Sequence, residues 1–214
     1  MQRVNLEKWS RATTYNFYKD QDFPHFSLCA DVDVTALKRF TEKKRCSFFL
    51  STLYCITHAV QNIPELKYRI RSHYPDEVVL HDMIHPSFTT PAQDDLFSFC
   101  TVEYTTDSKE FFYRGEQQIQ SLKEAPACLS EHPRDDVIYM TCLPWVRFTS
   151  FHFAMHQPKL DSIPRFAWGK IEQQDQKIVM PLAVQLHHGL ADGRHMGEFY
   201  QTFQELILDP GNIL

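Results

Sequence analysis

Strand-like and helix-like segments alternate along most of the chain, and no linker, internal repeat or low-complexity tract separates them. Apolar residues at every second position are typical of strands, and apolar residues three or four positions apart are typical of helices. The chain has 214 residues, which is enough for one well-buried core and short for two domains. We therefore expect residues 1–214 to form a single domain that contains both helices and strands.

The order of these segments predicts the fold class. Helices are expected up to about Glu42, with Asp33 as the N-cap, and over residues 48–62, 108–124 and 193–208. Strands are expected over residues 25–32, 66–71, 77–81, 87–90, 96–104, 137–144, 149–155, 165–172 and 177–187. This order fits an α/β (α+β) two-layer sandwich, in which helices cover a large mixed β-sheet.

Charge and cysteine content narrow the class of protein. The formal net charge is -5 and no basic block is present, which argues against a nucleic-acid partner. The longest apolar run, Ile178 to Val184, contains Pro181 and is too short to cross a membrane, and the amino terminus lacks the apolar core of a secretory signal. We therefore expect a cytoplasmic protein with no membrane partner. The six cysteines form no CxxC pair and are expected to be buried free thiols: Cys29, Cys46, Cys55, Cys100, Cys128 and Cys142.

Residues whose side chains could take part in catalysis are concentrated where the last expected strand meets the last expected helix. The strand ends in His187 and His188, and a turn flanked by Gly189 and Gly193 follows. Adjacent strand residues point to opposite faces, so only one of the two histidines can face a given site. A neutral imidazole accepts a proton well near physiological pH. The alternative is structural: a histidine that closes a strand, with Asp192 as the N-cap of the helix.

A metal site at this turn is a further alternative. His188, Asp192 and His195 are spaced at i, i+4 and i+7 and would share one face of a continuous helix. The two glycines make such a helix unfavourable, and the spacing differs from the HExxH of zinc proteases. No GxSxG motif or glycine-rich phosphate loop is present either. A metal-dependent hydrolase is therefore a weaker hypothesis than proton transfer by a histidine, and we expect no metal.

Three blocks of sequence resemble the chloramphenicol acetyltransferase family, which belongs to the CoA-dependent acyltransferases that carry an HHxxxDG motif. Residues 187–193 match that motif in full. Two further blocks match in the same order, from Trp9 to Tyr18 and from Pro144 to Phe151. The resemblance spans nearly the whole chain and implies a CoA-dependent acyltransferase-like fold.

The resemblance also implies roles for particular residues. His188 is the implied general base, which takes a proton from an acceptor hydroxyl as that oxygen attacks the thioester carbonyl of acetyl-CoA. Ser150 matches the serine whose hydroxyl stabilises the oxyanion. Asp192 is implied to be structural and to pair with Arg11, and Tyr18 matches a tyrosine of the acceptor pocket. The alternatives are an ordinary strand serine, a solvated arginine and a core aromatic residue.

The implied activity is direct acetyl transfer in a ternary complex, without an acyl-enzyme, to chloramphenicol or a similar hydroxylated small molecule (an acyltransferase of the EC 2.3.1 type). The family is associated with antibiotic resistance. Its members form homotrimers whose active sites lie between subunits, so the implied partners are acetyl-CoA, the acceptor and further copies of the chain.

Two positions depart from the family pattern. Ala167 replaces a threonine that helps to hold a water near the transition state, and Ile171 replaces a tyrosine that contacts the cofactor. These departures leave the base and the oxyanion donor intact but put the acceptor in question. They motivate the rival hypothesis of a non-catalytic relative that binds apolar ligands without turning them over.

Overall fold

A computed structural model describes residues 1–73, 76–94, 96–123, 125–127 and 134–214. In these ranges the helices are α1 (Ala12–Tyr18), α2 (Thr35–Lys44), α3 (Phe48–Gln61), α4 (Ser108–Lys123), α5 (Gly193–Leu208) and the short 3-10 helices η1 (Pro64–Lys67) and η2 (Pro210–Asn212). The strands are β1 (Gln2–Arg3), β2 (His25–Asp33), β3 (Tyr68–His73), β4 (Asp76–Leu80), β5 (His85–Pro91), β6 (Phe97–Thr101), β7 (Val137–Leu143), β8 (Arg165–Gly169), β9 (Glu172–Gln174) and β10 (Lys177–His187).

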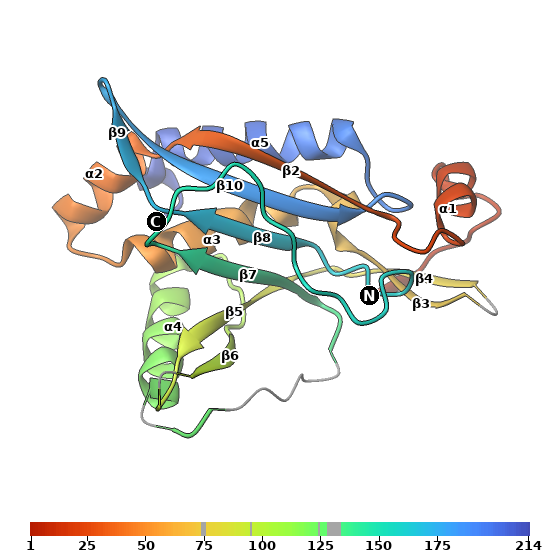
Figure 1. Cartoon of the computed structure of the whole chain (residues 1–214), viewed down its shortest axis with the longest axis horizontal. Coiled ribbons are helices and arrows are strands. Elements are labelled where there is room, and N and C mark those ends of the chain that lie inside the picture. Colours follow the sequence, from red (N-terminus) through yellow and green to blue (C-terminus); the bar gives the residue numbers. More distant parts are fainter. Residues whose placement is uncertain (74–75, 95, 124, 128–133) are drawn as a thin grey trace.

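The strands form one large mixed sheet and one small sheet (Figure 1). In the large sheet the order is β2-β10-β8-β7-β5-β6, and β9 pairs with β10. The pairs β5–β7 and β7–β8 are parallel, whereas β10 is antiparallel to both β2 and β8. The small sheet has the order β1-β4-β3 and is antiparallel. The expected mixed sheet covered by helices is therefore confirmed.

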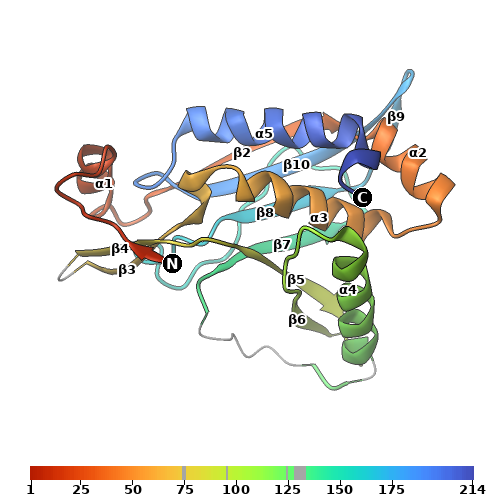
Figure 2. The same ribbon diagram turned by 180° about the vertical axis from the view of Figure 1, so that it is seen from behind.

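Helices cover one face of the large sheet, where α3 and α5 lie in front of the strands in Figure 2. The core lies between these layers and includes Leu53 and Ile56 of α3, Phe199 and Phe203 of α5, and Trp168 of β8. In the described part of the chain, no helix covers the opposite face. It is crossed instead by the chain between β7 and β8, which passes in front of β10 and β8 in Figure 1.

Local side-chain contacts explain where the helices begin. The Ser47 hydroxyl accepts a hydrogen bond from the Leu50 amide and caps α3, and Asp192 caps α5 by accepting from the Arg194 amide. At α2 the cap differs by one residue from the expectation. Asp33 is the last residue of β2, and its carboxylate accepts from the Thr35 amide and hydroxyl, while the N-cap position itself is Val34.

Most expected elements agree with the structure within two or three residues. The helix expected over residues 193–208 is confirmed at both ends, and α3 ends one residue before the expected Asn62. Residue 124, the expected end of α4, lies outside the described residues. Residues 165–172 divide into β8 and the start of β9.

The strand expected over residues 149–155 is wrong, because that stretch is irregular. Its alternating aromatic residues do not pair with a neighbouring strand. Phe151 and Phe153 line a pocket, and the Phe153 amide donates to the side chain of Gln185 rather than to a strand backbone. The alternation of aromatic residues here comes from side chains that pack against a sheet, and the segment itself is not a strand of that sheet.

Two further expectations concern cysteines and membranes. Five of the six cysteines lie in the described ranges and are free thiols, of which Cys55 and Cys100 are buried and Cys29, Cys46 and Cys142 are partly buried. Cys128 lies outside the described residues. None of the helices in the described ranges is long and apolar enough to cross a lipid bilayer.

Candidate active site

His187 ends β10 and His188 begins the turn that follows, yet their rings contact the consecutive β2 residues His25 and Phe26, whose side chains point to opposite faces of the sheet. The His187 ring is 2% exposed and meets the ring of His25 edge-on, with centroids 5.2 Å apart. Its Nδ1 accepts a hydrogen bond from the Gly189 amide at 3.1 Å, which bends the chain back at the start of the turn. His187 is therefore the structural member of the pair.

His188 is held between aromatic rings. Its ring lies parallel to that of Tyr18, the last residue of α1, with a centroid distance of 4.1 Å, and it contacts the ring of Phe26 at 4.6 Å. The His188 amide donates to the Pro24 carbonyl at 2.7 Å. The ring Nδ1 is buried and has no hydrogen-bond partner in the described part of the chain. The ring itself is half-buried.

An ion pair fixes the turn that follows His188. The Arg11 guanidinium donates to Asp192 Oδ2 at 2.9 Å, with side chains that are 11% and 35% exposed. Burial opposes ionisation of Asp192, but the hydrogen bond from Arg11, the nearby His195 and the Arg194 amide hold its pKa below the usual range. Asp192 also caps α5, and its own amide donates to His195 Nδ1. The carboxylate therefore joins α1 to the start of α5.

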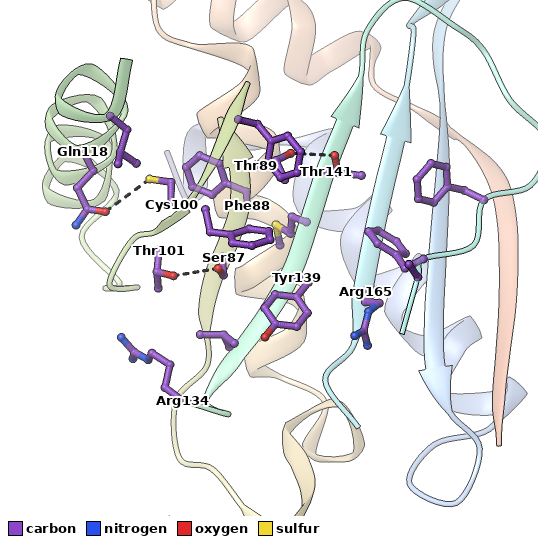
Figure 3. A pocket seen from close by; sticks show the side chains of 18 of the residues that line it. Ser87, Phe88, Thr89, Cys100, Thr101, Gln118, Arg134, Tyr139, Thr141 and Arg165 are labelled. Carbon is purple, nitrogen blue, oxygen red and sulfur yellow. Dashed lines mark hydrogen bonds between the residues drawn. The ribbon is translucent and has the colours of Figure 1, made fainter. Parts of the chain in front are cut away.

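A pocket of about 620 Å³ lies beside β5, β6 and β7, between α4 and the chain that follows β7. Figure 3 shows the pairs of polar side chains along its wall. The hydroxyls of Thr89 and Thr141 are 3.1 Å apart, and Thr101 donates to Ser87 at 3.0 Å. The remaining lining is largely aromatic and aliphatic, including Phe88, Phe97, Phe99, Phe151 and Phe153. Such a lining suits an apolar ligand with a few polar groups.

The charged groups at one end of this pocket are already neutralised. Figure 3 shows Arg134 and Arg165 there, on either side of Tyr139. Arg165 pairs with Asp161, and Arg134 bonds Asp136 and Glu103, each at 2.6 Å. These carboxylates leave no net positive charge for an anionic ligand. The pocket thus suits a neutral molecule.

The pocket also contains a thiol, that of Cys100. Burial raises the pKa of this thiol to about 12, so it stays protonated at neutral pH. Only a thiolate is a good nucleophile, so Cys100 is not suited to carry an acyl group. It lies 3.7 Å from Gln118 Oε1, toward which its hydrogen points.

The residues singled out from the sequence separate into two places. Arg11, Tyr18, His188 and Asp192 come together around the turn between β10 and α5. Ser150 does not join them by any contact in the described ranges; it is exposed and follows β7, next to the pocket residue Phe151. The described residues that line the pocket include none of these five.

Sequence reasoning missed the hydroxyl pair of Thr89 and Thr141. Both lie in segments that were expected to be strands. Thr141 stands between Met140 and Cys142 and was a weak signal, whereas Thr89 is followed by Thr90 in a strand that also contains His85 and Ser87, so nothing local marked it. The sequence could not show that two residues 52 positions apart face each other, because the register of β5 against β7 is set by the fold.

The metal alternative finds no support in geometry. Within the described ranges no three His, Cys, Asp or Glu side chains are grouped so that they could hold a metal ion. Asp192 and His195 take part in capping α5, and the His188 ring packs against Tyr18 and Phe26 instead.

Comparison with known proteins adds independent information. A family model described as chloramphenicol acetyltransferase matches residues 1–204. A chloramphenicol acetyltransferase of Clostridium perfringens is 28% identical over 208 residues, which cover 95% of this chain and 93% of the relative. Chloramphenicol acetyltransferase 3 of Escherichia coli is 27% identical over 206 residues, 95% of each chain.

Solved structures share the fold. A chloramphenicol acetyltransferase structure aligns with a TM-score of 0.87 at 24% identity and covers 97% of this chain and 100% of its own. The dihydrolipoamide acetyltransferase of Azotobacter vinelandii aligns with a TM-score of 0.68 at 13% identity, covering 94% of this chain and 88% of that one. At these identities the likeness is one of architecture.

Proposed function

Because the chain belongs to the chloramphenicol acetyltransferase family, whose model matches residues 1–204, we propose that it transfers the acetyl group of acetyl-CoA to a hydroxyl of chloramphenicol or of a similar neutral small molecule. The family consists of acyltransferases, and the relatives named above are acetyltransferases. The observation that carries the proposal is the placement of His188, whose ring is held by Tyr18 beside a turn fixed by Arg11 and Asp192.

His188 is proposed as the general base. A base must present an unprotonated nitrogen to the acceptor hydroxyl, so Nε2 takes the proton and Nδ1 carries the ring's own hydrogen before reaction. As the acceptor oxygen attacks the thioester carbonyl, its proton moves to Nε2. When the tetrahedral intermediate collapses, the carbon–sulfur bond breaks and the proton passes to the CoA sulfur. The products are an acetyl ester and CoA thiol, and no group of the protein is acylated.

The developing oxyanion needs a hydrogen-bond donor, and a preorganised donor contributes on the order of 3 kcal/mol. Ser150 is proposed for this role because the block around it matches the family. Thr141 is a second candidate, since its hydroxyl lines the pocket while Ser150 is exposed outside it. Removing each hydroxyl in turn separates the two candidates, because kcat should fall by a large factor only when the true donor is removed.

The active site is proposed to form between two copies of the chain in a homotrimer. In one protomer the described residues that line the pocket include neither His188 nor Tyr18. If the pocket of one protomer faces His188 of the next, acceptor and base come within reach of each other. Holding both substrates in one complex supplies much of the rate in a direct transfer.

The departures at Ala167 and Ile171 bear on the acceptor. Ala167 is fully buried and pairs in register with Thr141 on one side and Ala183 on the other. A hydroxyl at position 167 would therefore lie next to that of Thr141. Among the paired residues Thr141, Ala167 and Ala183, only Thr141 carries a hydroxyl. Ile171 packs at the margin of the main core. Both changes are compatible with altered acceptor preference.

The test mixes the purified protein with acetyl-CoA and a panel of neutral, anionic and cationic hydroxylated acceptors that includes chloramphenicol, and follows release of the CoA thiol. We expect turnover of neutral acceptors and its loss in His188→Ala. No turnover above that variant with any acceptor would refute an acetyltransferase. Calorimetry then tests the rival, since a non-catalytic binder holds the acceptor but has no affinity for acetyl-CoA.

A further inference from the structure

The chain between β7 and β8 contains a stretch, residues 148–163, that we call the covering segment. It crosses the sheet on the face opposite α3 and α5 (Figure 1). It contributes Phe151, Phe153 and Ala154 to the pocket wall. The covering segment forms no helix or strand, so no regular backbone ladder holds it in place. The position of that wall therefore depends on individual anchors.

Near residues 161–163 the anchors come from β3 and β8, where the Ile70 amide donates to the Ser162 hydroxyl and Arg165 pairs with Asp161. Over residues 152–158, which include the part next to the pocket, they come from one face of β2 and β10. His25 and Ser27 of β2 share a face because they are two residues apart, and in register with them lie His187 and Gln185 of β10. His25 Nε2 is 3.0 Å from the Pro158 carbonyl, and the Ser27 hydroxyl is 3.2 Å from His152 Nδ1. Both contacts reach the covering segment from the edge strand.

Gln185 is the anchor closest to the pocket wall. Its Oε1 accepts from the Phe153 amide at 3.1 Å, and its Nε2 donates to the Met155 sulfur at 3.0 Å. Gln185 is 1% exposed and is the polar member of an otherwise apolar strand from Ile178 to Leu186. A buried amide is costly unless its groups are bonded, and here both the oxygen and the nitrogen are bonded to the covering segment.

We propose that Gln185 is a positioning residue for the acceptor: its side-chain amide fixes the backbone at Phe153 so that Phe151 and Phe153 close one side of the pocket. Gln185 lies in β10, three residues before His188, which directly follows the last residue of that strand. The strand that leads to the proposed base thus also sets the pocket wall of its own protomer. The inference rests on the proposed acetyl transfer, because it assigns this pocket to the acceptor.

The test is Gln185→Leu, which keeps the approximate side-chain volume and removes both hydrogen bonds. Loss of the bond leaves the Phe153 amide without its acceptor, and we expect the KM for the acceptor to rise about tenfold while kcat and the KM for acetyl-CoA change less than about threefold. Hydrogen exchange at the Phe153 amide and its neighbours should accelerate. Met155→Leu removes the sulfur contact alone and should change the acceptor KM much less than Gln185→Leu.

Gln204→Leu is the matched control. Gln204 of α5 also bonds backbone with both ends of its amide, to the carbonyl and the amide of Asp33 at 2.9 and 3.0 Å, but at the far end of β2. It should lower the melting temperature by a similar amount and leave the acceptor KM unchanged.

Two results would overturn the proposal: equal acceptor KM values in Gln185→Leu and Gln204→Leu, or unchanged exchange at Phe153. If the wild-type protein acetylates no acceptor, the proposed function fails by itself. Hydrogen exchange then still decides whether Gln185 holds the covering segment.

Discussion

The ring of His188 lies flat on the ring of Tyr18, with centroids 4.1 Å apart and planes 7° from parallel. Tyr18 is the last residue of α1, and Arg11, which pairs with Asp192, is the N-cap of the same helix. Both ends of this seven-residue helix thus contact the motif that contains the base. Helix α1 therefore holds both His188 and Asp192 in place, one at each of its ends.

The stack predicts a graded effect at position 18. Tyr18→Leu removes the flat contact, which is worth about 1 kcal/mol for an aromatic pair, so kcat should fall roughly fivefold. Tyr18→Phe keeps the stack and should retain kcat. If the Tyr18 hydroxyl also contacts the acceptor, Tyr18→Phe raises the acceptor KM alone. Steady-state kinetics in which both substrates are varied separates these effects. Equal kcat values in Tyr18→Leu and wild type would contradict the role of Tyr18 in positioning His188.

The Arg11–Asp192 pair predicts a difference between two substitutions at one site. Asp192→Ala removes both the half-exposed ion pair and the helix cap and should lower the free energy of unfolding by about 2 kcal/mol. Asp192→Asn can still cap α5, so it should cost about 1 kcal/mol less than Ala. Urea unfolding followed by circular dichroism measures both. Equal losses would mean that the cap contributes nothing.

The same pair predicts how the stability of the fold depends on pH in the acid range. The pKa of Asp192 is lower in the folded protein than in the unfolded chain, so its ionised form stabilises the fold above the unfolded value. That contribution is lost as the pH falls through the folded pKa, which places the loss below about pH 4. The difference in unfolding free energy between wild type and Asp192→Asn should therefore shrink as the pH falls below about 4. A difference independent of pH would contradict the assignment.

The two candidate oxyanion donors predict opposite outcomes. Removing the true donor should reduce kcat roughly 100-fold or more with little change in either KM. Ser150→Ala and Thr141→Val are the matched pair, because each removes a hydroxyl with little change in volume. Thr89→Val controls for loss of the Thr89–Thr141 contact itself. A small effect in both Ser150→Ala and Thr141→Val would exclude a side-chain hydroxyl at either position as the donor.

A site shared between protomers predicts complementation. Thr101→Trp should fill the pocket, and His188→Ala removes the base, so each variant alone should be inactive. In randomly mixed oligomers about a quarter of the interfaces combine an intact pocket with an intact His188, and activity should recover to that level. Co-expression with two affinity tags and light scattering tests this. No recovery in confirmed mixed trimers would place the whole site within one protomer.

Local patterns predicted the fold where they were long and unambiguous. The strand that ends at His187 and the helix that begins at Gly193 were predicted to the residue, since each has a clear period and the turn has two glycines. Residues 149–155 of the covering segment were predicted as a strand because alternating aromatic residues look the same whether they pack within a sheet or on it. No local rule distinguishes the two, since the partners of Phe153 lie 32 residues away.

In the candidate site, too, only the local sequence pattern could be predicted, and the contacts between distant residues could not. The HHxxxDG motif was visible in seven consecutive residues, whereas Arg11 and Asp192 are 181 positions apart, and only the resemblance to a family suggested that they meet. The pocket could not be predicted, because α4, four strands and the covering segment each contribute side chains to it.

The position of β10 in the sheet has a consequence for how the chain must fold. This strand comes late in the sequence, yet it lies between β2 and β8 and pairs with β2 along residues 25–33. Until β10 is in place, β2 and β8 keep unpaired edges, which are prone to associate with other chains. Closing a contact across about three quarters of the sequence is also slow, because the loop entropy is lost before the pairing is gained. A folding intermediate that lacks β10 therefore has two open strand edges, and this topology predicts that aggregation starts from that intermediate.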